Sequence, residues 1–176
     1  MVPEFETERL RLRAFGEADL DRWAEIMADT RTVRYIGGEP LSREEAWHRL
    51  LRAAGLWPVI GYGYWAAERK QDGALIGMIG FADLKRTMTP SIEGLPEAGW
   101  IFAPDAHGQG YASEALAACL AWVEKALAGR EIVAIIDPGN APSLRVAEKA
   151  GFAVCETTRY RGDPILLLRR PGPPVR

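Results

Sequence analysis

The segment 97–127 constrains the fold of this chain more than any other part of the sequence. A run of strand-forming residues breaks at Pro104, passes through Gly108 and Gly110, and opens directly into a helical pattern. A strand, a glycine turn and a helix N-terminus in this order offer free backbone N–H groups to a phosphate. Glycine also lets the main chain approach a ligand closely, because no Cβ stands in the way. Two glycines alone suit a plain turn equally well, so the rest of the sequence must decide between these interpretations.

Length, charge and cysteine usage exclude several classes of protein. The chain has 176 residues, which suits one compact domain with a core, and its formal net charge of -2 gives no basic field for nucleic acid or membrane. The acidic N-terminus lacks the basic and apolar regions of a secretory signal, and the apolar run 115–123 is too short to span a bilayer. Because Cys119 and Cys155 show no metal-ligand spacing, we expect a cytoplasmic protein without a metal site.

Hydrophobic periodicity and punctuation residues predict strands alternating with helices. Leucines at every second position from Leu10 indicate a half-buried strand, and Ser42 with Glu45 three residues later is typical of a capping box at a helix start. Pro58 is expected to end that helix. The expected strands are 10–14, 62–68, 75–84, 97–102, 131–136, 152–160 and 165–169. The expected helices are 20–28, 43–57, 112–127 and 141–150.

These elements describe a single α/β (α+β) domain over residues 1–170, followed by a proline-rich, flexible tail at 171–176. Most neighbouring strands are joined by hairpins or loops. The unit made of strand 97–102, its helix and strand 131–136 should be parallel, with a right-handed crossover. We find no internal repeat and no low-complexity linker.

Five segments together resemble one known family. They are 6–13, 75–80, 97–100, the loop 107–115, and 140–152 with its Asn-Ala-Pro-Ser start. In order and spacing they resemble the Gcn5-related N-acetyltransferase (GNAT) superfamily, and within it the branch named after RimJ and RimL. The resemblance covers nearly the whole chain. It implies a GNAT fold: one mixed, mostly antiparallel sheet of about seven strands, a central parallel pair splayed around acetyl-CoA, and about four helices.

The resemblance also implies an enzyme that moves an acetyl group directly from acetyl-CoA to a primary amine. Loop amides would bind the pyrophosphate, and main-chain groups of the preceding strand would pair with the pantetheine arm. His107 stands where the family loop usually begins with Gln or Arg, which main-chain binding should tolerate. The implied cofactor residues are Ile101, Phe102, Ala103, His107, Gly108, Gln109, Gly110, Tyr111, Ala112, Asn140 and Ser143.

Glu97 is the candidate base, because an amine with a pKa near ~10 must lose a proton before it attacks. A charged residue at the exposed end of a strand is the plain alternative, and Glu93 and Glu68 are weaker candidates. Ser143 would donate a hydrogen bond to the departing sulfur, although a thiol of pKa near ~8.5 leaves readily without strong acid help. Substrate-binding candidates are Glu97 with Tyr35, Trp65 and Trp100, from an aromatic set that also holds Trp57 and Tyr62.

Two other functions compete with this one. A dinucleotide-binding enzyme is suggested by the pattern G-x-G-x-x-A at 61–66, but that pattern precedes a strand instead of opening a helix. A non-catalytic regulator that binds acyl-CoA would share every motif described above. The sequence leaves open the acceptor amine, the choice between Ser143 and water as the acid, a homodimer, and preference for another acyl-CoA. The near-neutral charge of the chain and the acidic neighbourhood of Glu93 and Glu97 favour a cationic acceptor.

Overall fold

The computed structural model describes residues 1–127 and 129–172 and contains two compact units. The first unit consists of Met1–Gly80 and Trp100–Ala115. The second consists of Phe81–Gly99 and the described residues from Leu116 onward. Of the tail expected at 171–176, residues 173–176 lie outside the described residues.

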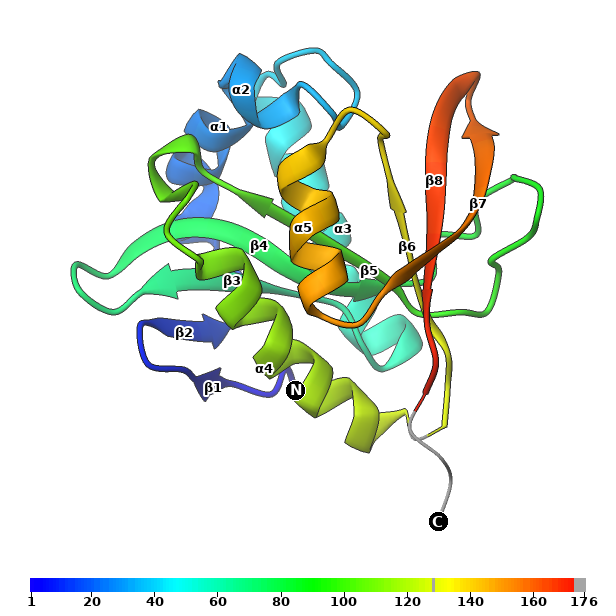
Figure 1. The fold of residues 1–176 in the computed structure, drawn as a ribbon. Coiled ribbons are helices and arrows are strands. Elements are labelled where there is room, and N and C mark those ends of the chain that lie inside the picture. The colour runs from blue at the N-terminus through cyan, green and yellow to red at the C-terminus, as the bar shows by residue number, and fades with distance from the viewer. Residues whose placement is uncertain (128, 173–176) are drawn as a thin grey trace. The chain divides into compact units, whose positions relative to one another are not determined.

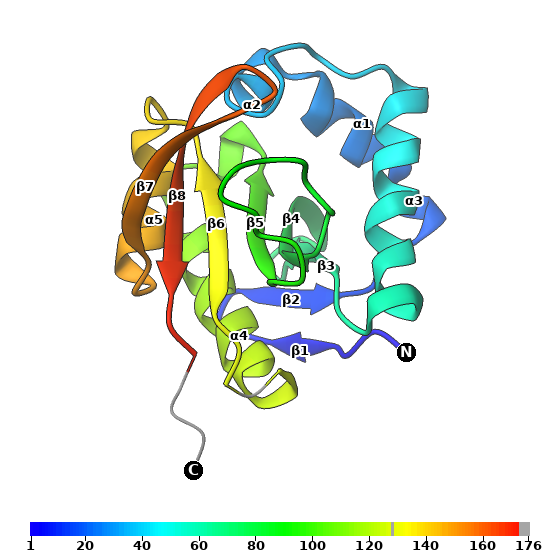
Figure 2. The ribbon, with the colours of Figure 1, turned by 90° about the vertical axis from the view of Figure 1, so that its right-hand side faces the viewer.

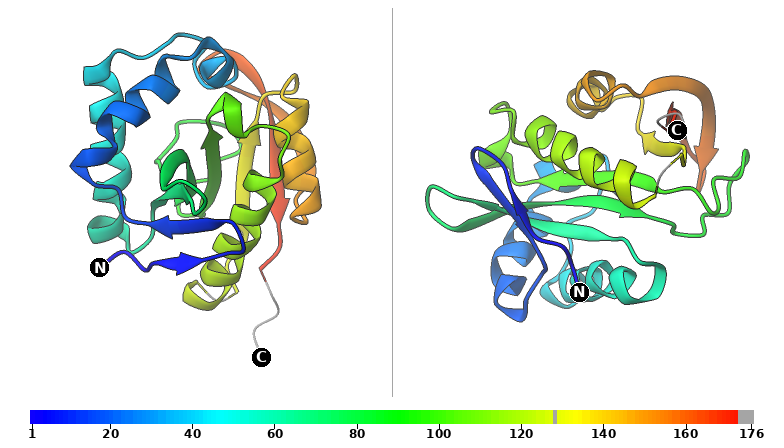
Figure 3. Two further views of the ribbon diagram at one scale, coloured as in Figure 1. Left: turned by 90° about the vertical axis from the view of Figure 1, so that its left-hand side faces the viewer. Right: turned by 90° about the horizontal axis from the view of Figure 1, so that it is seen from below.

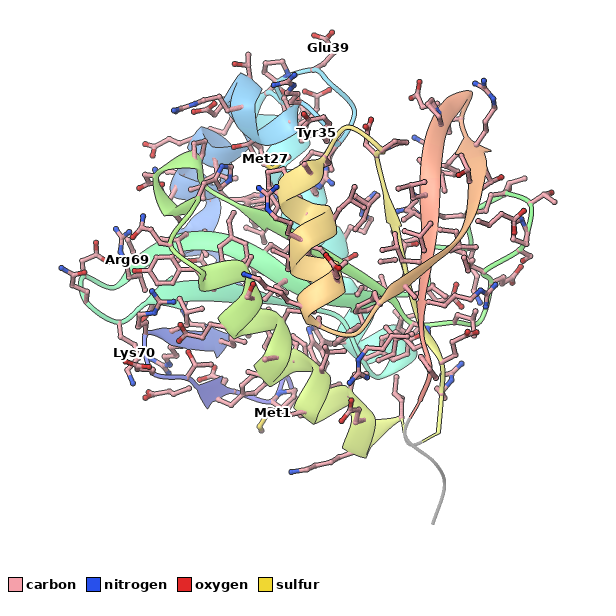
Figure 4. All side chains as sticks on the ribbon, viewed as in Figure 1. Met1, Met27, Tyr35, Glu39, Arg69 and Lys70 are labelled. Carbon is pink, nitrogen blue, oxygen red and sulfur yellow. The ribbon has the colours of Figure 1, made fainter. Side chains whose placement is uncertain are left out.

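Antiparallel strands form the sheet of the first unit (Figure 1). They are β1 (Phe5–Glu6), β2 (Leu10–Arg13), β3 (Tyr64–Arg69) and β4 (Ala74–Ala82), the last of which runs into the second unit. The expected alternation in β2 is confirmed, because Leu10 and Leu12 are fully buried while Arg11 is exposed. Gly73, with φ of +71°, closes the β3–β4 hairpin, and Figure 4 shows Arg69 and Lys70 at its tip.

Helices α1 (Leu20–Ala28) and α3 (Arg43–Ile60) lie side by side in the first unit, and both pack against its sheet (Figure 3). The 3-10 turn η1 (Glu17–Asp19) leads into α1, and α2 (Thr30–Val33) follows it. Their apolar faces join residues of the sheet in one core. Its fully buried or nearly buried members include Trp23, Met27, Leu50, Ala66, Leu75, Met78, Ile101 and Ala103.

The capping box expected at Ser42 is confirmed, since the Glu45 amide donates to Ser42 and the Ser42 amide donates to Glu45. The expected helix end at Pro58 is wrong, because α3 continues to Ile60. Pro58 removes one backbone donor in the last turn but does not stop that turn from forming. The helix ends at Gly61, which has a φ of +82° that only glycine adopts easily. The Gly61 N–H donates a hydrogen bond to the Trp57 carbonyl.

The second unit is built around β6 (Ile132–Ile136), β7 (Ala153–Tyr160) and β8 (Asp163–Arg170). Figure 2 shows these strands side by side in the order β6, β8, β7, and both pairs are antiparallel. Strand β5 (Glu97–Phe102), which begins in this unit, pairs in parallel with β6 through Glu97 and Val133, as expected for a strand–helix–strand unit. Helix α5 (Ala141–Lys149) precedes β7.

The mixed, mostly antiparallel sheet predicted from the sequence is confirmed. Over the described residues its strands are bonded in the order β1-β2-β3-β4-β5-β6-β8-β7. This is one strand more than expected, because the two-residue β1 is too short to show a period. Helix α2 is likewise additional and spans only four residues. No helix in the described part of the chain combines the length and apolar character needed to cross a membrane.

Candidate active site

A glycine loop joins the end of β5 to α4 (Tyr111–Ala126) in the first unit. After the short turn η2 (Pro104–Ala106), Gly108 and Gly110 adopt φ of +73° and +82°, so the loop conformation requires glycine at both positions. A Cβ placed on Gly108 would meet nothing within 4 Å, and one on Gly110 would meet only the end of Arg9, at 3.5 Å. The loop is therefore open to a ligand, as its predicted role requires.

The loop presents unpaired amides at the start of a long helix. The helical hydrogen bonds of α4 start from the Glu114 N–H, which donates to Gly110 at 3.0 Å. The N–H groups of residues 111–113 precede that bond and have no helical acceptor. These amides and the helix dipole favour an anion at this position by up to ~1 kcal/mol in ordinary settings. The site can thus hold a phosphate group without a dedicated cationic side chain.

Side chains tie down carbonyl groups around this loop. His107 Nε2 lies 2.8 Å from the Phe102 carbonyl oxygen, so this nitrogen carries the proton, because a carbonyl can only accept. Gln109 Nε2 donates to the Asp105 carbonyl at 2.7 Å, and Arg9 Nη1 donates to the Gln109 carbonyl at 2.9 Å. The carbonyls of Phe102, Asp105 and Gln109 are thus engaged by side chains. The His107 ring itself contacts the main chain of β5.

The end of β5 offers fewer backbone groups than the sequence suggested. The Ala103 N–H donates to Ile76 of β4 at 2.8 Å, and the Ile101 carbonyl approaches Gly77 so closely that a Cβ there would come within 2.4 Å of it. Backbone groups of successive strand residues point to opposite edges, so Phe102 alone of the three directs its groups away from β4. The expectation that the backbone groups of Ile101 and Ala103 also pair with a cofactor arm is therefore wrong, because these groups face β4.

Glu97 lies at the start of β5 and is only 5 % exposed, so the alternative of a solvated strand-end charge is wrong. Arg86, from the loop after β4, donates to both its carboxylate oxygens at 2.6 and 2.8 Å. The guanidinium also lies over the Tyr160 ring, 4.7 Å from its centroid. Burial opposes the positive charge of the Arg86 side chain, but the hydrogen bonds to Glu97 raise the pKa of Arg86 above its usual value. No periodic pattern marks Arg86 in the sequence.

The two weaker candidates for the base are also engaged. Glu68 accepts a hydrogen bond from Arg13 at 2.6 Å within the first unit. Glu93 is 62 % exposed and lies 3.5 Å from Lys85. The expected acidic surroundings at Glu93 and Glu97 favoured a cationic acceptor. In the structure each of these carboxylates has a cation beside it, Lys85 next to Glu93 and Arg86 next to Glu97.

Asn140 and Ser143 come together at the start of α5. The Asn140 side chain accepts a hydrogen bond from the Ser143 N–H at 3.2 Å, which is the helix-capping role expected of it. Both residues are half-buried, and Ser143 lies in the first turn of the helix. This cap fixes where the Ser143 side chain emerges from the helix.

The aromatic candidates for the acceptor site differ in exposure. Trp65 is fully buried, donates to the Pro3 carbonyl at 2.7 Å, and packs edge-on against Phe5 and Trp57, so its predicted role in substrate binding is wrong. Tyr35 is half-buried in the loop after α2, with Arg34 over its ring (Figure 4). Trp100 is half-buried on β5. Tyr35 and Trp100 therefore stay as candidates.

A surface hollow of about 260 Å³ adjoins the end of β5 in the first unit. It is lined by Arg22, Glu25, Ile26, Asp29, Arg31, Ala103, Pro104 and Asp105. Its charged side chains are paired with one another: Arg22 lies 3.2 Å from Glu25 and 3.3 Å from Asp105, and Arg31 lies 2.6 Å from Asp29. Among residues 1–127 and 129–172, no group of three His, Cys, Asp or Glu side chains is placed to hold a metal ion. Burial raises the pKa of the Cys119 thiol, as suits a small residue of the core.

Comparisons with known proteins agree with this geometry. Residues 9–153 match the family model described as an acetyltransferase (GNAT) domain. The protein YkkB of Bacillus subtilis is 31% identical over 93% of both chains. A solved structure from Bordetella pertussis, titled as a GNAT-family acetyltransferase, is 31% identical with a TM-score of 0.84, covering 96% of this chain and 99% of that one.

A more distant structure shares the fold. It is the spermidine N-acetyltransferase of Vibrio cholerae in complex with CoA and spermine, with 18% identity and a TM-score of 0.72 over 94% of this chain and 97% of that one. The matched domain spans the glycine loop, Glu97 and Ser143, so the features described above fall inside it. The chain therefore belongs to the GNAT acetyltransferase family and is an acetyl-CoA-dependent acetyltransferase.

Proposed function

We propose that this protein transfers the acetyl group of acetyl-CoA to a primary amine by direct attack of the amine nitrogen on the thioester carbonyl. The C–N bond forms as the C–S bond breaks, the thiolate of CoA leaves, and the amine gives up one proton. The observation that supports this most is the open glycine loop at the N-terminus of α4. Its amides suit a diphosphate, which is the most highly charged part of the donor.

The cofactor contacts follow from the loop and from the family resemblance. We assign the diphosphate to the amides of residues 108–112 and the pantetheine arm to the outward-facing N–H of Phe102, whose carbonyl is already engaged by His107. Asn140 and Ser143 are assigned to the arm and to the departing sulfur on the resemblance alone. Because a thiolate is a good leaving group, Ser143 needs only to orient the sulfur with a hydrogen bond and need not act as a strong acid.

Glu97 is the proposed acceptor of the amine proton. Its low exposure favours transfer through a water molecule over direct contact with the amine. Arg86 already occupies one acceptor position on each carboxylate oxygen, which fixes the orientation of the remaining lone pairs. Under this assignment Arg86 orients the carboxylate, and the water carries the proton to it.

The acceptor is a primary amine, either of a protein N-terminus or of a small molecule. One protein of the same fold, the spermidine N-acetyltransferase of Vibrio cholerae, has a solved structure in complex with CoA and spermine, and a polyamine is therefore one candidate. In this chain Glu97 is paired with Arg86, so a polycation has less to gain here than an unpaired acidic site would offer. Tyr35 and Trp100 are the proposed contacts for the carbon skeleton of the acceptor.

Release of free thiol from acetyl-CoA across a panel of amines tests this function. The panel should hold peptides with free N-termini, polyamines, amino acids and aminoglycosides, each with an N-acetylated control. Turnover that requires a free amine is the expected result. Tight CoA binding by calorimetry without turnover for any amine would favour the acyl-CoA-binding regulator instead, and absence of CoA binding would contradict both functions.

A further inference from the structure

A residue outside the glycine loop controls the conformation of that loop. Arg9 lies directly before β2, about a hundred residues away in sequence, and its side chain is 40% exposed. Its Nη1 donates to the Gln109 carbonyl at 2.9 Å. Its guanidinium also stacks on the Tyr111 ring, 4.4 Å from the centroid, so it contacts the loop at two points.

Glu114 fixes the guanidinium in this place. It lies in the first turn of α4 and accepts from Arg9 Nε at 2.7 Å, from the Arg9 amide at 2.9 Å and from Thr7 Oγ1 at 2.6 Å. Burial acts to raise the pKa of Glu114, but these hydrogen bonds outweigh burial and lower it. The carboxylate is thus charged at neutral pH and holds both the backbone and the side chain of Arg9.

The bond to Gln109 has a geometric consequence for the neighbouring amide. In a trans peptide the carbonyl oxygen of one residue and the N–H of the next point in opposite directions. Holding the Gln109 oxygen toward Arg9 therefore turns the Gly110 N–H to the opposite side of the loop. Residues 107–110 are all exposed, so this amide lies in an exposed segment of the chain.

We propose that Arg9 is the positioning residue of the diphosphate loop, an inference that rests on the proposed function. It acts in two ways. It orients the Gly110 amide through the Gln109 carbonyl, and its positive charge offsets Glu114, whose carboxylate would otherwise oppose a bound diphosphate. Since its contacts are with the loop and with Glu114, its effect falls on affinity for the donor's diphosphate and leaves the transfer step unchanged.

Arg9→Met tests this role, because methionine keeps an apolar stem but has neither the charge nor the donors. Arg11→Met is the matched control: Arg11 lies two residues later, in β2, and pairs with Glu4 at the surface. The readouts are the Kd for CoA by calorimetry, and kcat/KM with acetyl-CoA and with S-acetylpantetheine, which lacks the diphosphate. A thermal melt by circular dichroism checks the fold of each variant.

The expected result is a Kd for CoA raised about tenfold or more in Arg9→Met, the size typical of lost hydrogen bonds from a charged group. KM for acetyl-CoA should rise in parallel, while kcat and the use of S-acetylpantetheine stay unchanged and Arg11→Met behaves as wild type. If Arg9→Met does not fold, Arg9→Lys carries the same test, since lysine keeps the charge but lacks the planar guanidinium that donates to two acceptors in a fixed geometry.

Equal CoA affinity in the wild type and the Arg9 variant would overturn this inference alone. Equal losses with both donors would also overturn it, because they would show a general structural role. A wild-type protein that binds no CoA would instead overturn the proposed function.

Discussion

The guanidinium of Arg86 donates hydrogen bonds to both carboxylate oxygens of Glu97, at 2.6 and 2.8 Å, and these two side chains are the charged pair at the start of β5. The pair is largely removed from solvent, with the Glu97 side chain 7% and the Arg86 side chain 18% exposed. Two charges buried together are tolerated because each satisfies the other, whereas either one alone would be costly. This relationship makes the stability of the second unit and the proposed role of Glu97 as proton acceptor depend on the same contact.

Removing one partner should therefore destabilise the fold more than removing both. Arg86→Met is expected to lower the free energy of unfolding by about 3–5 kcal/mol, because it leaves Glu97 as an uncompensated buried charge. The double variant Arg86→Met/Glu97→Leu should recover most of this loss. Urea unfolding at pH 7 measures both values. A single variant within about 0.5 kcal/mol of wild type would show that solvent reaches Glu97 in solution.

Glu97→Gln tests the catalytic role of Glu97 through the pH profile, because the variant also leaves Arg86 without its carboxylate partner. If Glu97 accepts the amine proton, kcat should fall by roughly 10²–10⁴-fold and the pH dependence of kcat should change shape. Glu68→Gln and Glu93→Gln, at the two weaker candidate positions, should keep the wild-type profile. A Glu97→Gln enzyme with reduced rate but the wild-type pH profile would remove Glu97 as the proton acceptor and leave it a structural partner of Arg86.

Gly110→Glu should abolish CoA binding, because it places a carboxylate in the diphosphate loop and strains a backbone with φ of +82°. Gly162→Glu is the matched control. Gly162 has φ of +92° at the β7–β8 turn, and a Cβ there meets nothing within 4 Å, whereas one on Gly110 meets only the end of Arg9 at 3.5 Å, so the backbone strain and the added charge are similar. Calorimetry should show no CoA affinity for the first variant and wild-type affinity for the second. Unchanged affinity in Gly110→Glu would refute the assignment of the loop.

The buried pair Arg13–Asp19 predicts an acid-sensitive part of the stability. Burial acts to raise the pKa of Asp19, but hydrogen bonds from Arg13 and from the Gly16 N–H outweigh it and lower this pKa below its ordinary 3.8. A lowered pKa in the folded state means that the stabilisation is fully present above pH about 3.8 and is lost as the pH falls through the folded-state value.

Asp19→Asn should thus be less stable than wild type at pH 6–7, and this difference should shrink as the pH is lowered below about 4. Urea unfolding across this range measures it. Asp21→Asn is the control, since its pair with Arg43 is exposed and should contribute less than about 1 kcal/mol. A difference between wild type and Asp19→Asn that is constant with pH would contradict the assigned pairing.

Local sequence signals predicted the elements that local physics decides. The capping box at Ser42 satisfies helix amides within three residues, and the glycines at 108 and 110 encode a loop that other residues form only under strain. The prediction that the helix ends at Pro58 failed because a proline in the last turn costs only one hydrogen bond, and Gly61, three residues later, provides the left-handed conformation that ends the helix.

Pairings between distant segments could not be predicted in this way. Arg9 meets Glu114 across more than a hundred residues, and Arg86 sits in a polar loop whose sequence shows no period. Trp65 is a second case in which the sequence alone could not predict the surroundings of a side chain. A tryptophan suits both a pocket wall and a core, and only its contacts with Phe5 and Trp57 show which of these it occupies.

The first residues of the chain cover part of its core, which matters for anyone who trims this domain for expression. The family match begins at residue 9, yet the Trp65 indole is capped by Pro3 and covered by Phe5, and Thr7 holds the first turn of α4 through Glu114. A fragment that begins at residue 9 would expose the indole of Trp65. It would also lose the hydrogen bond from Thr7 to Glu114 in the first turn of α4. Boundaries for expression should therefore be set by these contacts and start before Pro3.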